Sequence, residues 1–411
     1  MKNTVKNFMF YIAFVASLGG LLFGFDTAVI SGAEKSIQTV YGLSDFSHGF
    51  TIAIALIGTI IGAFICSKPV EKYGRLKALK IIAFLYFVSA VGSAAIIDWY
   101  SFLFFRFAGG LAVGASSVVG PMYIAEISPS RWRGRFVAFF QFNIVLGIVL
   151  AYFSNYWIHG IAHDWQWMLG VEAIPAIVFA LLLYTVPESP RWLVKQNKET
   201  EARRIIKEVS NADIEQEVHE IRESLVATGN CGEKLFQRKY RKPILYAFLI
   251  ATFNQLSGIN AILYYAPRIF EMSGVFTDSA MMQSIVIGLT NLTFTMIGMI
   301  LIDQVGRKKL LYIGSIGMAI SLALVAKGFC QDTFSGYYML ACLMGFIAFF
   351  AISLGAVIWV LISEVFPNSV RSKGQVLGSM THWVWSALLS WMFPVFIRTG
   401  GTFIFSFFAI M

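Results

Sequence analysis

The sequence predicts an all-α membrane protein in which twelve spanning helices form two six-helix halves. Of its 411 residues 57% are hydrophobic and only 13% are charged, whereas a water-soluble protein ordinarily carries about 25% charged residues. The apolar residues also gather in stretches close to the 20 or so that a helix needs to cross about 30 Å of hydrocarbon. Together these observations exclude a soluble enzyme and predict a bundle of membrane helices.

Six apolar stretches predict the spans of the first half, at residues 8–30, 49–67, 78–97, 101–125, 136–158 and 165–186. Five more follow at 243–270, 279–302, 310–329, 335–363 and 375–397, and residues 402–411 begin a twelfth. About ten residues are too few to cross a bilayer as a helix. We therefore expect the sequence to stop inside its last span.

A long polar segment at residues 187–242 separates the two sets of spans. Ile205, Ile206, Val209, Val218 and Ile221 recur in it at helical spacing among charged residues, which predicts short amphipathic helices. The expected organisation is an N-terminal bundle at 1–186, a cytoplasmic helical linker at 187–242 and a C-terminal bundle at 243–411. The linker is either a solvated connector that packs under the bundles or part of a gate.

The net charge of +9 reports orientation in the membrane and not a nucleic-acid partner. If the N-terminus is placed in the cytoplasm, 27 of the 32 basic residues fall in the inner segments. Only Lys35, Arg268, Lys327 and Arg398 lie outside, and Arg106 falls within a span. By the positive-inside rule we expect a multi-pass protein of the plasma membrane, or of the inner membrane of a bacterium, with a cytoplasmic N-terminus.

The residues that build metal sites and common catalytic centres are not in the required patterns. Cys66, Cys231, Cys330 and Cys342 show no metal-ligand spacing. The predicted spans contain no His-Glu-x-x-His, paired catalytic aspartates or Ser-His arrangement. We expect no metal, no cofactor and no enzymatic activity.

The two sets of spans carry the same loop motifs. EKYGRLK at residues 71–77 resembles DQVGRKK at 303–309, at an offset of 232 residues. Glu126, Pro129 and Arg133 match Glu364, Pro367 and Arg371 at an offset of 238. A parallel repeat of two six-helix halves accounts for both matches, and such halves place a substrate site between them near the midplane.

The charged residues of these motifs are candidates for a cytoplasmic gate. Carboxylates and guanidinium groups on adjacent helix ends can form bridges that hold an inner gate shut and break when the halves rock. The alternative for any single residue is that it only sets the topology. The gate candidates are Glu71, Arg75, Glu126, Arg133, Glu188, Arg191, Asp303, Arg307, Glu364 and Arg371.

At these residues the chain resembles the sugar porter family of the major facilitator superfamily. The matching segments are GLLFGFDTAVISG at 20–32, PESPRW at 187–192, QLSGIN at 255–260 and EVFP at 364–367, with both loop motifs. Within the family the chain is most similar to bacterial proton-coupled xylose symporters, which share LLYTVPESPRW at 182–192. The resemblance implies the major facilitator fold and transport of a monosaccharide.

Three ionisable residues lie inside the predicted spans of the first half, at Asp26, Arg106 and Glu172. Such residues are costly in hydrocarbon and are functional candidates by default. Each lies about five to seven positions from the outer end of its span, so all three share one depth layer at about 1.5 Å per residue. An aspartate between a cation and low-dielectric surroundings can change its protonation as a cavity opens and closes. The alternative is a permanent structural ion pair.

The resemblance assigns roles to these three residues. It implies that Asp26 is the proton site, Arg106 its partner and Glu172 a nearby modulator. Uncoupled facilitators of the family typically lack the aspartate, so its presence favours symport.

A sugar site needs amides, which both donate and accept hydrogen bonds, and an aromatic platform. The predicted span at 243–270 supplies Asn254, Gln255, Asn260 and Tyr264 around Gly258, where the helix can loosen. The resemblance implies that the site is completed by Phe23, Gln141, Asn291, Gly355, Trp359, His382 and Trp383. For any one of these, packing between helices is the alternative role.

Three positions depart from the family pattern and leave the identity of the sugar open. Asn254 replaces the first of two successive glutamines, and His382 stands where the family usually has glutamine or asparagine. Ala356 replaces the proline of a Gly-Pro-Val-x-Trp run. An imidazole changes the donor and acceptor geometry and titrates near neutral pH. His382 is either a sugar ligand or a structural histidine.

The sequence therefore predicts a secondary transporter that imports a xylose-like or glucose-like monosaccharide by proton symport through alternating access. Its expected partners are the sugar, protons and the lipid bilayer, and we expect a monomer. The alternatives are an uncoupled facilitator of the same fold and a membrane sugar sensor that does not transport.

Overall fold

The computed structural model is helical throughout its described part, which comprises residues 2–129, 132–209, 214–229, 235–331, 336–367, 369–398 and 400–411. Within these residues eleven helices are long and apolar enough to cross a membrane, and a shorter apolar helix follows at Gly401–Ile410. The eleven helices occur in the predicted order, which confirms the predicted fold class.

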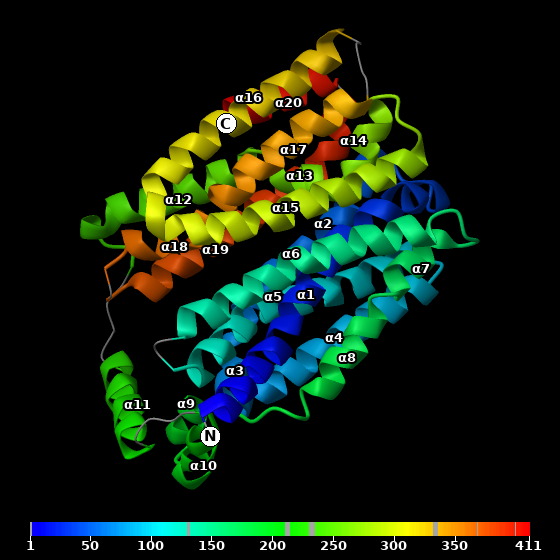
Figure 1. Cartoon of the computed structure of the whole chain (residues 1–411). Coiled ribbons are helices and arrows are strands. Elements are labelled where there is room, and N and C mark those ends of the chain that lie inside the picture. The colour runs from blue at the N-terminus through cyan, green and yellow to red at the C-terminus, as the bar shows by residue number, and fades with distance from the viewer. Residues whose placement is uncertain are drawn as a thin grey trace.

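The helices form two bundles that lie side by side (Figure 1). The first bundle contains α1 (Lys2–Val40), α2 (Asp45–Ile65), α3 (Ser67–Tyr73), α4 (Arg75–Ala95), α5 (Trp99–Ile127), α6 (Arg133–Ile158), α7 (Asp164–Gly170) and α8 (Ala173–Leu182). The second contains α12 (Arg241–Leu256), α13 (Ile259–Tyr264), α14 (Ala266–Met272), α15 (Thr277–Val305), α16 (Arg307–Gln331), α17 (Gly336–Ile352), α18 (Leu354–Val365), α19 (Arg371–Ile397) and α20 (Gly401–Ile410).

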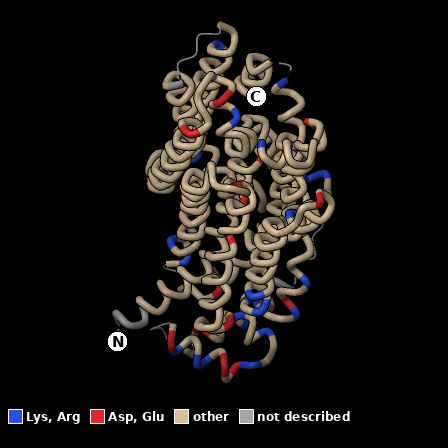
Figure 2. Tube along the Cα trace, turned by 90° about the vertical axis from the view of Figure 1, so that its right-hand side faces the viewer, with Lys and Arg blue, Asp and Glu red and all other residues tan. Residues whose placement is uncertain are grey.

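Three helices of the polar segment, α9 (Pro190–Lys195), α10 (Glu199–Val209) and α11 (Ile214–Gly229), lie at one end of the bundles, and a short 3-10 helix at Arg238–Tyr240 leads into α12. We call this the linker end and the opposite end the distal end. Ser189 caps α9, because its side chain accepts a hydrogen bond from the N–H of Trp192. Lys, Arg, Asp and Glu gather towards the two ends, with few between them (Figure 2).

The repeated loop motifs adopt the same backbone conformation. Gly74 and Gly306 have φ of 97° and 90°, values that residues with a Cβ rarely adopt. Each glycine directly precedes a helix, α4 and α16 respectively. This shared geometry supports the repeat inferred from the sequence.

Three of the spanning segments are interrupted. The sixth breaks between α7 and α8 beside Glu172, and the tenth breaks between α17 and α18 at the buried Ser353. The seventh breaks at Ser257 and Gly258, where Gly258 has φ of 83°, and again at Tyr265. The loosening expected at Gly258 is therefore confirmed, and an added Cβ there would lie 2.4 Å from the ring of Phe408.

The first helix is longer than the sequence predicted. The predicted span ended at residue 30, whereas α1 continues to Val40. Ile30, Ala33 and Ile37 are almost completely buried, so one apolar stripe at i, i+3 and i+7 holds the last turns against the protein. The charged residues within those turns, which the sequence placed in a loop, therefore lie in the helix.

Candidate functional site

The predicted proton-coupling residues come together in the first bundle. Asp26 on α1 and Arg106 on α5 form an ion pair with 2.6 Å between Oδ1 and Nη1, and each residue is only 3% exposed. Gly109, one turn after Arg106, allows the close approach of Ser89, because an added Cβ there would lie 2.3 Å from Ser89 Oγ. A carboxylate and a guanidinium in direct contact stabilise each other's charged forms inside the bundle.

Glu172, at the break between α7 and α8, is also buried and lies close enough to Asp26 and Arg106 to interact with both. Its Oε1 has no hydrogen-bond partner. The second bundle reaches this group through Tyr264, which interacts with Asp26 and Arg106. The site therefore joins two carboxyl groups, one guanidinium and a tyrosine from the other bundle.

The predicted amide cluster forms one hydrogen-bonded chain in the second bundle. Gln255 accepts a bond from Asn260 Nδ2 at 3.0 Å, and its own Nε2 lies 3.3 Å from Asn254 Oδ1. The same Nε2 lies 2.9 and 3.1 Å from the two ring nitrogens of His382. Asn260 also donates to Ser386 at 2.5 Å, a residue that the sequence analysis missed. Side-chain hydrogen-bond donors and acceptors are thus concentrated around the break at Gly258.

Aromatic rings cover this amide chain. The ring centroid of His382 lies 4.9 Å from that of Trp359 and 5.1 Å from that of Trp383. Phe23 on α1 contacts Trp383 across the boundary between the bundles, with 5.7 Å between centroids. The platform predicted for a sugar is therefore assembled from both bundles.

Among the contacts described, three other sugar-site candidates form no hydrogen bond with the amide chain of Asn254, Gln255 and Asn260. Asn291 accepts a bond from Thr295 on its own helix at 3.4 Å, and Gly355 lies beside Phe350, whose ring would be 3.2 Å from an added Cβ. Gln141 is half-buried on α6. Their role in a sugar site stays a prediction.

At the linker end, several gate candidates form contacts within the first bundle. Arg75 binds Glu126 through two bonds of 2.7 and 2.8 Å. Glu188 accepts bonds from the backbone N–H groups of Arg75 and Leu76. Burial raises the pKa of Glu188, and the backbone N–H groups of Ser189, Leu76 and Arg75 oppose that rise.

The remaining gate candidates also belong to the linker end. Glu71 pairs with Lys195 on α9 at 2.7 Å, and Arg307 pairs with Glu364 within the second bundle at 3.4 Å. Arg133 and Arg371 are exposed and Arg191 is half-buried. The side chain of Asp303 lies outside the described residues. A contribution of these residues to a gate stays a prediction.

A charged cluster at the distal end was missed by the sequence analysis. Glu34 on α1 accepts bonds from His48 on α2 at 2.6 Å and from Arg268 on α14 at 3.1 Å. Lys35 pairs with Glu271 at 2.7 Å. Further bonds between the bundles join Asp45 to Arg398 and Gln38 to Arg268, and His159 Nε2 lies 3.6 Å from Asp278 Oδ1. The buried stripe of Ile30, Ala33 and Ile37 was the signal that these turns belong to the protein interior.

Comparisons with known proteins agree on one family. The family model described as "Sugar (and other) transporter" matches residues 12–411. The D-xylose-proton symporter of Escherichia coli K12 is 39% identical over 429 residues, covering 96% of this chain and 87% of the relative. The arabinose-proton symporter of Bacillus subtilis is 36% identical over 409 residues, covering 97% and 88% respectively.

Solved structures give the same result. An inward-open structure of the Escherichia coli xylose transporter matches with a TM-score of 0.86 at 37% identity, covering 98% of this chain and 93% of that chain. The structure of the proton:xylose symporter bound to 6-bromo-6-deoxy-D-glucose matches with a TM-score of 0.82 at 37% identity, covering 98% and 94%.

Proposed function

Because the chain belongs to the sugar porter family of the major facilitator superfamily, and is therefore a transporter and not an enzyme, we propose that it imports a monosaccharide by proton symport. The observation that carries this proposal is the buried Asp26–Arg106 pair. Intramembrane charges of this kind mark proton pathways. The relatives named as xylose-proton and arabinose-proton symporters support the same assignment.

The arrangement of the two sites supports coupling between proton and sugar. Tyr264 lies close enough to Asp26 and Arg106 for their charges to act on its hydroxyl group, and it follows Asn260 of the amide chain by one helical turn. A proton on Asp26 weakens its attraction for Arg106. The movement of Arg106 is then transmitted through Tyr264 to the helix that holds Gln255, so that sugar binding and protonation favour the same conformation.

We further propose that the linker end faces the cytoplasm and that the structure is inward-facing. The excess of basic residues in the segments at the linker end supports this orientation. Ion pairs across the distal end support closure on the outer side. The TM-score of 0.86 against an inward-open structure agrees with this state.

Accumulation of radiolabelled xylose or glucose in proteoliposomes under an imposed pH gradient tests the proposal. We expect accumulation with the unmodified protein and none with Asp26→Asn, which cannot release a proton. Asp98→Asn is the matched control, because Asp98 caps α5 at the surface and asparagine also serves as an N-cap. Unchanged accumulation in Asp26→Asn would refute proton coupling through this residue.

Counterflow in the same vesicles separates the alternatives. An uncoupled facilitator exchanges labelled sugar but never accumulates it above the external concentration, and a sensor gives no exchange. Calorimetry with pentoses, hexoses and inositols then identifies the sugar. Gln255→Ala should weaken sugar binding about tenfold or more, since the buried side-chain amide that would bond the sugar is lost. Intact sugar binding in this variant would contradict the proposed sugar site.

A further inference from the structure

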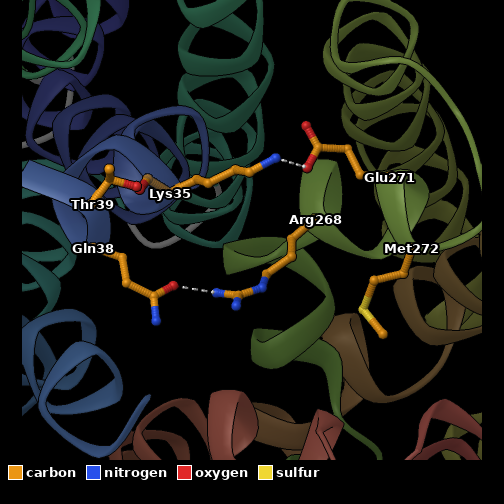
Figure 3. Close-up of a pocket in the computed structure, with 6 residues that line it drawn as sticks. All are labelled: Lys35, Gln38, Thr39, Arg268, Glu271 and Met272. Atoms are coloured by element: carbon orange, nitrogen blue, oxygen red, sulfur yellow. Dashed lines mark hydrogen bonds and ion pairs between the residues drawn. The ribbon is translucent and has the colours of Figure 1, made fainter. Parts of the chain in front are cut away.

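The distal cluster contains a buried proton-binding pair that the proposed transport cycle does not use. Glu34 and His48 belong to the first bundle and are 2% and 0% exposed, respectively. Both His48 Nε2 and Arg268 Nη1, from the second bundle, contact the same oxygen, Glu34 Oε2. Figure 3 shows Arg268 pointing towards Gln38 and Lys35 towards Glu271 across a cavity of about 410 Å³. The cluster therefore bridges the bundles.

The hydrogen-bond geometry assigns one proton to the pair in this closed state. A separation of 2.6 Å between Nε2 and Oε2 requires a hydrogen between them. His48 Nδ1 is buried and has no hydrogen-bond partner. A second proton on Nδ1 would be a buried donor without an acceptor, which costs about 1–3 kcal/mol. The pair is therefore a neutral imidazole beside a carboxylate.

Other charged groups around the pair are already bonded elsewhere. Lys35, next to Glu34, is bonded to Glu271 of the second bundle. Asp45, on the same helix as His48, is bonded to Arg398 and accepts a bond from Gln38. The ring of Tyr265 lies edge-on to His48 with 6.2 Å between centroids. Arg268 is thus the bonded cation that balances the negative charge of Glu34.

Opening of the distal end removes this cation. Arg268 is carried by α14 in the second bundle, whereas Glu34 and His48 are carried by α1 and α2 in the first. When the bundles separate, the carboxylate keeps a neutral imidazole as its partner. A partly buried charge without its counter-ion is strongly unfavourable. In that open state, water that reaches His48 Nδ1 gives it both a hydrogen-bond partner and a source of protons.

We propose that Glu34 and His48 form a second proton-binding site, in which a proton from the external solution replaces Arg268 whenever the distal end opens. The proton binds His48 Nδ1 and leaves to the same side when Arg268 returns. The site therefore moves no proton across the membrane. External acid instead stabilises the conformation that accepts external sugar. This inference rests on the alternating access and orientation proposed above.

Distances between spin labels at the distal end test the proposal. Val40, at the end of α1, and Phe276, before α15, are exposed and belong to different bundles. The labels are placed there after the four native cysteines are replaced by alanine. We expect the open-to-closed ratio of the otherwise unmodified protein to rise about threefold or more between about pH 8 and about pH 5.5, where imidazoles ordinarily titrate. In an Asp26→Asn background, which lacks the proton site of the transport cycle, the rise should persist and His48→Gln should remove it.

Two further variants keep the test decisive. Asp26→Asn alone should keep a pH response, because Glu34 and His48 remain. Glu34→Gln removes the charge that Arg268 balances, so in the Asp26→Asn background the open-to-closed ratio should also lose its pH dependence. In that background, a pH response that survives in both His48→Gln and Glu34→Gln, or the absence of any response before those changes, would overturn the proposal. Since no sugar gradient is involved, failure here is distinguishable from failure of symport.

Discussion

The two ends of the molecule use charged residues differently. At the distal end, Glu34, Lys35 and Asp45 of the first bundle bond to cations or carboxylates of the second. At the linker end, Arg75 bonds to Glu126 and Arg307 to Glu364, each within its own bundle. Under the alternating access that we propose, bonds between the bundles must break in each cycle, whereas bonds within a bundle can persist. We therefore predict that the distal charges influence opening and that these linker-end charges stabilise each half.

Apolar packing follows the same division. One buried cluster runs through both bundles and includes Ile37 and Ile52 of the first with Ile262 and Phe393 of the second. Towards the linker end the buried clusters are separate, one around Val119 in the first bundle and one around Ile362 in the second. Burial of shared apolar surface at the distal end adds to the ionic bonds in closing it.

Removal of Arg75 should give the largest effect, and the effect should be on stability. The side chains of Arg75 and Glu126 are 8% and 10% exposed, and breaking such a pair from one side costs about 3–5 kcal/mol. We expect Arg75→Gln to lower the thermal midpoint by about 5 °C or more. Tryptophan fluorescence during heating measures it. The double variant with Glu126→Gln should recover part of the lost thermal stability, because no unpaired charge is left. An unchanged midpoint in Arg75→Gln would show that this linker-end pair does not stabilise the first bundle.

Substitution of Gly49 should instead shift the conformational balance. An added Cβ there would lie 1.8 Å from the carbonyl oxygen of Trp391, where α2 of the first bundle packs on α19 of the second. We expect Gly49→Leu to disfavour distal closure by about 2 kcal/mol, which is on the order of a thirtyfold change in the open-to-closed ratio. Spin-label distances measure the ratio.

The control for Gly49 is Gly134, at the start of α6, where an added Cβ meets nothing within 4 Å. Gly134→Leu should leave the distance distribution unchanged. If Gly49→Leu gave the same distribution as the control, the close approach of α2 and α19 would not limit closure.

Removal of Lys35 should give the smallest effect. Its side chain is 65% exposed although it bonds to Glu271 across the bundles, and exposed pairs contribute less than about 1 kcal/mol. We expect Lys35→Ala to raise the open-to-closed ratio by less than about fivefold. High salt should reduce the difference further. A change as large as that of Gly49→Leu would show that exposed pairs also determine closure.

Some site residues could be recognised from the sequence because their context is informative. Asp26 and Arg106 stand among long apolar runs, where a charge needs a specific partner. Gln255 and Asn260 flank Gly258, which allows a helix break. Ser386 had no such signal, since a serine can lie inside a membrane helix bonded to its own backbone.

Glu34 and His48 were missed for a related reason. Each lies just beyond the predicted limit of an apolar stretch, where a charge is ordinarily solvated and unremarkable. The structure extends α1 by ten residues past that limit and buries both side chains. Hydropathy averages over a window and cannot distinguish a helix end that meets water from one that meets another bundle.

The membrane class, the two repeated halves, the break at Gly258 and the Asp26–Arg106 layer could be predicted from the sequence. They follow from local composition and spacing, which act along a single helix. Which charges bond across the bundles is visible only in the tertiary structure. These bonds join residues far apart in the sequence, such as Glu34 and Arg268, which are separated by 234 residues. Under the proposed alternating access, the same sequence must also break them when the bundles separate.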